Sequence, residues 1–136
     1  MLDLWRSARP KLPLRSRNEA GRTVLLILSH APFDGDVTWN ALRMARTLVD
    51  RHVPVRVFVM NDAIDLVRTG AMPEGAEFDL QAMLRDLLPR GGRVKICTTC
   101  VNRCGIGQGA VMPEVTMSTM ADLAEWVVDS DRVLVF

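Results

Sequence analysis

Short, almost continuously apolar runs alternate with amphipathic stretches along this chain, and this alternation constrains the fold more than any other feature. The first run, residues 23–29, reads Thr-Val-Leu-Leu-Ile-Leu-Ser. A strand that is apolar at every position is typical of a parallel sheet with both faces covered. Further strands are predicted at residues 55–60, 93–97, 113–116 and 132–136. The pattern therefore predicts an α/β domain of three layers, with a mainly parallel five-stranded sheet in the middle.

Amphipathic helices are predicted between these strands. The first follows a cap at Asp36 and runs to about residue 51, and the second spans residues 79–88, where apolar residues recur at helical spacing. A short helix is expected to end near Arg68, and Thr119–Asp122 is typical of a capping box at the start of the last helix. The residues expected to be buried are Val37, Ala41, Met44 or Ala45 and Leu48 in the first helix, and Met120, Leu123, Ala124, Val127 and Val128 in the last.

Charge divides the chain into two parts. Residues 1–22 carry six Lys or Arg residues against two acidic ones, whereas residues 23–136 carry 11 against 14. The first part has two prolines and no apolar period, so we predict a flexible basic N-terminal arm, with a partner- or RNA-binding arm as the alternative. We expect residues 23–136 to form one α/β domain that does not bind nucleic acid.

The chain shows no sign of a membrane segment. No apolar run approaches the roughly 18 residues that a membrane span needs, and Asp3 and Arg6 interrupt the apolar residues at the amino terminus. We therefore expect a cytoplasmic protein without a membrane partner. Because cytoplasmic thiols are kept reduced, clustered cysteines there suggest sulfur, redox or metal chemistry rather than a disulfide framework.

All three cysteines of the chain, Cys97, Cys100 and Cys104, lie within eight residues. Cys97 ends a predicted strand, and a helix is predicted to begin at about residues 98–100. A helix amino terminus stabilises an anion, and Arg103 adds a positive charge nearby. The segment therefore favours chemistry that uses a thiolate, and the rest of the chain is interpreted as the scaffold that presents it.

Polar residues follow two other predicted strands. His30 comes just after the first strand, and Asn61 and Asp62 follow the second. In parallel sheets, ligands bind beyond the carboxyl ends of the strands. We therefore predict that Ser29, His30, Asn61 and Asp62 lie on the same rim as Cys97, and that His30, Asn61 and Asp62 line its pocket.

Several stretches, taken in order and spacing, resemble the DsrE/DsrF-like family and, within it, the YchN-like branch. The stretches that carry the resemblance are Phe58–Ile64, Phe78–Leu84, Val94–Cys100 with Gly105-Ile106, Leu123–Trp126 and Ser130–Phe136. A looser match around Ala31-Pro32 and Asn40–Arg43 extends the resemblance to residues 23–136. Two departures are that Cys104 stands where many members have arginine, and that His30 is not typical of the family.

The resemblance implies a flavodoxin-like fold and a homo-oligomer, either a trimer or a hexamer. It also implies a sulfur donor or acceptor protein as partner, because the sulfur-relay members of the family carry sulfur as a persulfide on one cysteine. That cysteine corresponds to Cys97, eight positions before Gly105, and Cys100 matches the second cysteine of the YchN-like branch.

Three kinds of chemistry remain open for the cysteines. In the first, Cys97 accepts and carries a persulfide, and Cys100 or Cys104 assists or resolves it, as in a sulfurtransferase or a thiol redox protein without a cofactor. In the second, Cys97, Cys100 and Cys104 bind zinc or an iron–sulfur cluster, with His30 or another subunit as the fourth ligand. In the third, the thiols only pack inside a non-catalytic oligomeric interaction protein.

Overall fold

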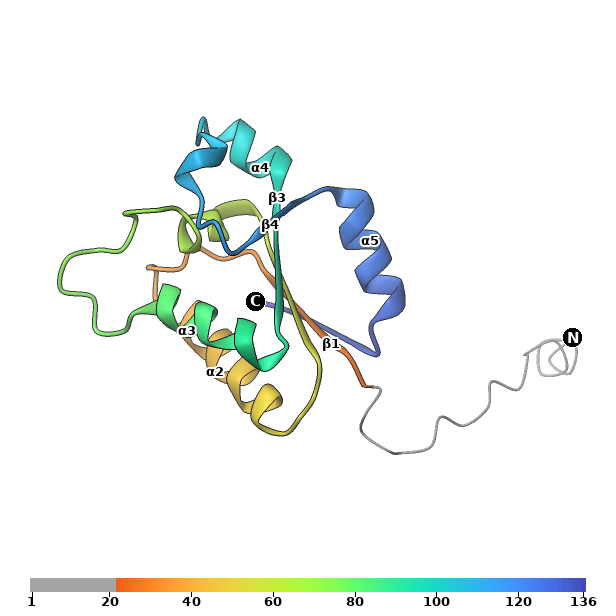
Figure 1. Ribbon diagram of the computed structural model, residues 1–136. Coiled ribbons are helices and arrows are strands. Elements are labelled where there is room, and N and C mark those ends of the chain that lie inside the picture. The colour runs from red at the N-terminus through yellow and green to blue at the C-terminus, as the bar shows by residue number, and fades with distance from the viewer. Residues whose placement is uncertain (1–21) are drawn as a thin grey trace, which may run out of the picture.

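The computed structural model describes residues 22–136, so nearly all of the predicted N-terminal arm lies outside the described residues. The described chain contains a sheet of five parallel strands in the order β4-β3-β2-β1-β5 (Figure 1). The strands are β1 (Val24–Leu28), β2 (Val55–Val59), β3 (Arg93–Cys97), β4 (Thr116–Ser118) and β5 (Arg132–Val135). The prediction of a mainly parallel five-stranded sheet is confirmed.

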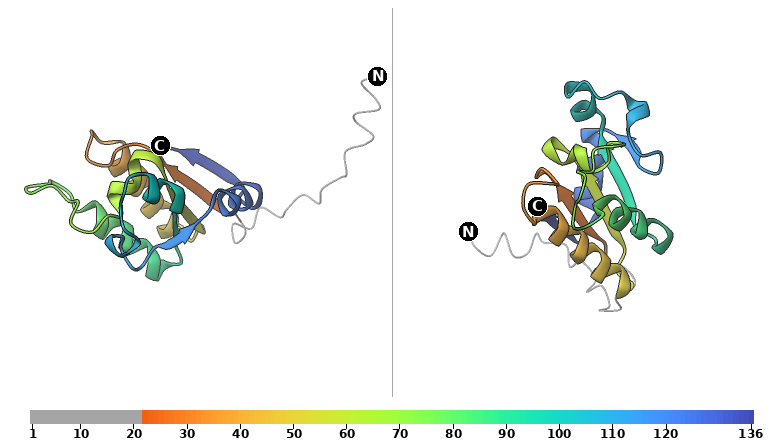
Figure 2. Two further views of the ribbon diagram at one scale, coloured as in Figure 1. Left: turned by 90° about the horizontal axis from the view of Figure 1, so that it is seen from above. Right: turned by 90° about the vertical axis from the view of Figure 1, so that its left-hand side faces the viewer.

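Helices cover both faces of this sheet, as a three-layer α/β fold requires. Figures 1 and 2 show α2 and α3 on one side and α5 on the other. The α-helices are α2 (Val37–Asp50), α3 (Leu80–Leu87), α4 (Thr98–Arg103) and α5 (Met120–Asp129), and short 3₁₀ turns lie at Asn61–Leu66, Leu88–Arg90 and Gln108–Ala110. Within residues 22–136, no helix is long and apolar enough to cross a membrane.

The two faces of the sheet bury cores of unequal size. In β1, Leu26 packs in a large core with residues of α2 and α3, whereas its neighbour Leu25 packs in a small core on the opposite face. The small core contains Leu25, Phe58, Cys97, Leu123 and Trp126. Successive strand residues point to opposite faces, which explains why the run had to be apolar throughout.

The buried stripe of α2 agrees with the prediction at Ala41 and Ala45 and differs from it elsewhere. Val37 and Met44 are exposed, and Leu48 is only partly buried. The residues that are buried are Thr38, Ala41, Leu42, Ala45 and Val49. The buried face of α2 includes the polar residue Thr38, which a search for apolar residues passes over. The predicted face was therefore rotated slightly around the helix from the observed one. Asp36 occupies the N-cap position, but its side chain makes no capping hydrogen bond.

The predicted core face of α5 is mostly wrong. Leu123 is buried as predicted, and Trp126 joins it, whereas Met120, Ala124 and Val127 are exposed and Val128 is 86% exposed. Because α5 is the only α-helix on its side of the described sheet, no other described helix covers its outer surface. Helical periodicity could not choose the buried face, since apolar residues lie on more than one side of this helix.

The short fourth strand is displaced along the chain from its predicted position at residues 113–116. It lies at Thr116–Ser118, and its residues pair with Lys95, Ile96 and Cys97 of β3. Pro113 has no backbone N–H to donate to a ladder, which favours a strand that starts later. The displacement places Ser118 directly beside Cys97.

The capping box at the start of α5 is confirmed. The Asp122 carboxylate accepts hydrogen bonds from the Ser118 hydroxyl at 2.7 Å, from the Thr119 N–H at 2.9 Å and from the Thr119 hydroxyl at 3.1 Å. These donors, Ser118 first, lower the pKa of Asp122 from its ordinary 3.8 to about 2. The ionised carboxylate therefore ties the end of β4 to α5.

We expect Asp122→Ala to destabilise the protein in a pH-dependent way. The pKa of Asp122 is depressed in the folded state, so its contribution is fully present above about pH 4 and is lost as the pH falls towards 2. Urea unfolding from pH 6 to pH 2 should therefore show a wild-type advantage that shrinks below pH 4. Asp36→Ala, which removes a side chain without a capping bond, should cost less at pH 6. An advantage that stays constant over this range would contradict the assignment.

Candidate functional site

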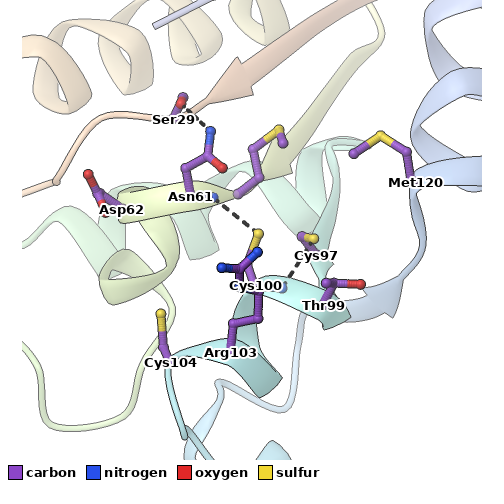
Figure 3. Close-up of a pocket in the computed structure, with 10 residues that line it drawn as sticks. Ser29, Asn61, Asp62, Cys97, Thr99, Cys100, Arg103, Cys104 and Met120 are labelled. Carbon is purple, nitrogen blue, oxygen red and sulfur yellow. Dashed lines mark hydrogen bonds between the residues drawn. The ribbon is translucent and has the colours of Figure 1, made fainter.

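The carboxyl ends of β1, β2 and β3 border a pocket of about 710 Å³ that all three cysteines line (Figure 3). The lining residues are Ser29, Met60, Asn61, Asp62, Cys97, Thr99, Cys100, Arg103, Cys104 and Met120. The structure thus brings together Asn61, Asp62 and the cysteine segment, as predicted from the strand ends.

Cys97 lies at the junction between a strand and a helix. It is the last residue of β3 and the N-cap of α4, as the sequence predicted, and its Sγ accepts the N–H of Cys100 at 3.4 Å. Its side chain is only 3% exposed and packs in the small core beneath α5. A backbone N–H that donates to sulfur stabilises negative charge that develops there during thiol exchange.

Cys100 lies between Cys97 and the end of β2. It is partly buried, and its Sγ accepts the backbone N–H of Asn61 at 3.4 Å. Asn61 has a φ of 52°, a left-handed conformation that asparagine tolerates better than most residues. Its side-chain amide also donates to the Ser29 hydroxyl at 2.8 Å. Figure 3 shows these contacts as a chain from Ser29 through Asn61 to Cys100 and Cys97.

The environment of Cys100 raises the pKa of its thiol above the ordinary 9.0. Burial is the largest cause, followed by the side-chain hydrogen bond with Cys97, and the Asn61 N–H opposes both. The charges of Cys97 and Cys104 raise the pKa further. Cys100 therefore stays protonated to a higher pH than a free thiol does.

Arg103 and Cys104, the other two residues of the predicted cysteine site, lie at the carboxyl end of α4. Cys104 is exposed, and its N–H donates to the Cys100 carbonyl at 3.1 Å, which continues the helical turn. Arg103 is exposed and also lines the pocket. The exposure of the three cysteines therefore decreases from Cys104 through Cys100 to Cys97.

His30 does not join the residues that line this pocket, although it was predicted there. Its Nε2 lies 2.9 Å from the carbonyl oxygen of Asp34 and 3.6 Å from the Asp34 carboxylate, so the loop after β1 holds the ring. Met60, Thr99 and Met120 line the pocket without having been predicted. Met60 follows β2 directly, so its place at a strand end could have indicated it, whereas the position of Met120 depends on how α5 packs.

The spacing of the cysteines also suggested a metal site. Among residues 22–136, no three His, Cys, Asp or Glu side chains are grouped so that they could hold a metal ion. His30, the proposed fourth ligand, is held by Asp34 instead. The geometry of the described chain gives the metal hypothesis no support.

Known proteins resemble this chain over nearly its whole described length. The model of the DsrE/DsrF-like family matches residues 22–136. Protein YchN of Escherichia coli K12 is 30% identical over 115 residues, which cover 83% of this chain and 97% of YchN. An uncharacterised protein of Methanopyrus kandleri is 29% identical over 113 residues, which cover 83% of this chain and 93% of that protein.

Solved structures agree with this match. The crystal structure of the E. coli YchN protein has a TM-score of 0.77 at 29% identity and covers 85% of this chain and 99% of its own. A protein of unknown function from Methanobacterium thermoautotrophicum has a TM-score of 0.64 at 13% identity, over 83% of this chain and 97% of its own, and is similar in fold alone. The parallel sheet with helices on both faces is therefore the fold that this chain shares with YchN.

We expect the alkylation rate of Cys100 to reach half its maximum at a higher pH than that of a free thiol, since burial and Cys97 raise its pKa. Cys97→Ala removes the second-largest cause and should shift the midpoint to lower pH. Cys104→Ala removes the weakest one and should shift it less. The measurement is iodoacetamide labelling of Cys100 against pH, read by peptide mass spectrometry. Equal shifts in the two variants would contradict this account.

Proposed function

This chain belongs to the DsrE/DsrF-like family, and on that basis we propose that it handles sulfur through its cysteine pocket, with Cys97 as the persulfide acceptor and carrier. The observation that carries the proposal is that all three cysteines line one pocket at the carboxyl edge of a parallel sheet. Three thiols facing the same space can exchange sulfur with one another, whereas thiols that serve only as packing have no need of a shared opening. The reducing cytoplasm is the compartment that suits this chemistry.

Loading transfers one sulfur atom without net oxidation. The Cys97 thiolate attacks the outer sulfur of a donor persulfide, a new S–S bond forms at Cys97, and the S–S bond of the donor breaks. The donor leaves as a thiolate and takes up a proton. The N–H of Cys100, 3.4 Å from the Cys97 sulfur, supports the negative charge that this sulfur carries during the attack.

Unloading follows one of two routes. The thiolate of an acceptor protein can attack the outer sulfur of the Cys97 persulfide, which restores Cys97. Alternatively, the Cys100 thiolate attacks the inner sulfur, so that hydrosulfide leaves and a Cys97–Cys100 disulfide forms, which an external thiol must then reduce. The three-residue spacing across the first turn of α4 favours Cys100 as this resolving thiol.

A homo-oligomer is the assembly that we propose for this site. Val127 and Val128 of α5 and Val133 and Val135 of β5 are exposed apolar residues, and we call these four the α5/β5 surface. The strand β5 lies at the edge of the described sheet, and such an edge can pair with a strand from a second copy. Exposed apolar patches of this kind are typical of protein interfaces, and a second copy provides an identical patch.

Reduced protein treated with glutathione persulfide and then desalted should gain about 32 Da in intact mass, and dithiothreitol should remove the gain. Cys97→Ser should lose the part of the gain that survives prolonged desalting, because a persulfide on either remaining, more exposed cysteine exchanges with thiols in solution. Cys100→Ser should keep it for longer than the wild type, because the resolving thiol is absent, and a wild-type disulfide would appear as a loss of about 2 Da. Full loading of Cys97→Ser, together with lost loading in Cys100→Ser and Cys104→Ser, would refute the role of Cys97.

The proposed homo-oligomer can be tested separately by sedimentation. Wild-type protein should sediment as a trimer or hexamer, and the double variant Val128→Asp with Val135→Asp should sediment as smaller species, because it places charges on the α5/β5 surface. Met44→Asp, at another exposed apolar position, on α2, is the control and should leave the assembly intact. Circular dichroism verifies that each variant is folded. A monomeric wild type, or a double variant of unchanged size, would overturn the proposed interface.

A further inference from the structure

The three cysteines lie at three depths in one pocket. Cys104 is exposed, Cys100 is partly buried and Cys97 is 3% exposed. Thiol exchange needs the attacking sulfur to reach the outer sulfur of the donor persulfide along the S–S axis. A donor persulfide carried on another protein can make that approach to an exposed cysteine far more easily than to one that lies beneath α5.

Cys104 is also within one helical turn of Cys100. The N–H of Cys104 donates to the Cys100 carbonyl at 3.1 Å, so the backbone remains helical between the two residues. Residues four apart on a helix are neighbours on one face, with their Cβ atoms roughly 5–6 Å apart. In the opposite direction along the chain, at the amino end of α4, the sulfur of Cys97 lies 3.4 Å from the backbone nitrogen of Cys100. Cys100 therefore stands between the outer and the inner thiol.

Two further observations agree with this order. Cys97 and Cys104 both raise the pKa of the Cys100 thiol through their charges, which agrees with a place for Cys100 between them. Arg103 lies beside the outer thiol, lines the same pocket and makes no ion pair with the residues that the structure describes. A persulfide is anionic when it is deprotonated, so an exposed guanidinium at the mouth of the pocket attracts it.

We propose that Cys104 is the thiol that first takes sulfur from a protein-bound persulfide, and that Cys100 passes this sulfur inward to Cys97. The inference rests on the proposed sulfur function and deepens it by assigning an order to the three thiols. In each step, a thiolate attacks the outer sulfur of the preceding persulfide, one S–S bond forms, one S–S bond breaks, and the preceding cysteine leaves as a thiolate. The oxidation state of the transferred sulfur does not change, so the sequence needs neither oxidant nor reductant.

The middle thiol makes this transfer depend on pH. Because burial keeps Cys100 protonated at neutral pH, its attack on the Cys104 persulfide is slow there and accelerates as the pH rises. Sulfur should therefore accumulate on Cys104 before it appears on Cys97, and the delay should shorten at higher pH.

The test compares a bulky and a small donor. Persulfidated serum albumin is the bulky donor and glutathione persulfide the small one, and alkylation followed by peptide mass spectrometry follows sulfur at each cysteine over time. With albumin, Cys104→Ser should load Cys97 about tenfold more slowly than the wild type, because the exposed acceptor is missing. With glutathione persulfide the difference should be smaller. Cys100→Ser should hold sulfur at Cys104.

The matched control is Asn102→Ala, an exposed residue of α4 that does not line the pocket, and it should load like the wild type from both donors. Wild-type loading of Cys97 in Cys104→Ser with albumin, or sulfur on Cys97 before Cys104, would overturn the proposed order and leave the role of Cys97 intact. Failure of the wild type to load Cys97 from either donor would instead refute the proposed function.

Discussion

The parallel pairing of β3 between β2 and β4 is the constraint on which the rest of this structure depends. Val59 pairs with Ile96, and Cys97 pairs with Ser118, so β2, β3 and β4 end at the same edge of the sheet. Asn61 follows β2 closely enough for its N–H to reach the Cys100 sulfur. A shift of one residue in this register would turn Cys97 to the opposite face of the sheet and take Asn61 away from Cys100.

The unequal coverage of the sheet explains the properties of the site. The face beneath α2 and α3 holds the large core, which supplies most of the apolar burial. Among the described helices, only α5 covers the other face, and the small core there includes Cys97. A thin layer can bury one thiol and still leave a pocket beside it, whereas a second helix packed over α4 would close that pocket. The same coverage by one helix leaves Val128 exposed.

Sequence patterns located the elements of this fold better than their faces. The bounds of β3, the capping box of Thr119 and Asp122, and the gathering of Asn61 with Cys97 were all predictable, because they follow from local spacing and from the rule that parallel strands end at one edge. The buried face of α5 was not predictable in this way. Whether Trp126 or Val128 is buried depends on which residues of the sheet pack against the helix, and local spacing does not reveal them. His30 was misplaced because Asp34, within the same loop, holds its ring.

The depth of a thiol limits the chemistry that it can perform. An exposed cysteine meets protein-bound donors readily, but a persulfide held there also meets every other thiol in solution. A buried cysteine protects its persulfide but cannot be reached by a large donor. One side chain cannot satisfy both requirements, and the short helix α4 separates them by placing Cys104 at the surface and Cys97 beneath α5. In the proposed order of transfer, Cys100 joins the two because helical spacing keeps it about one turn from each.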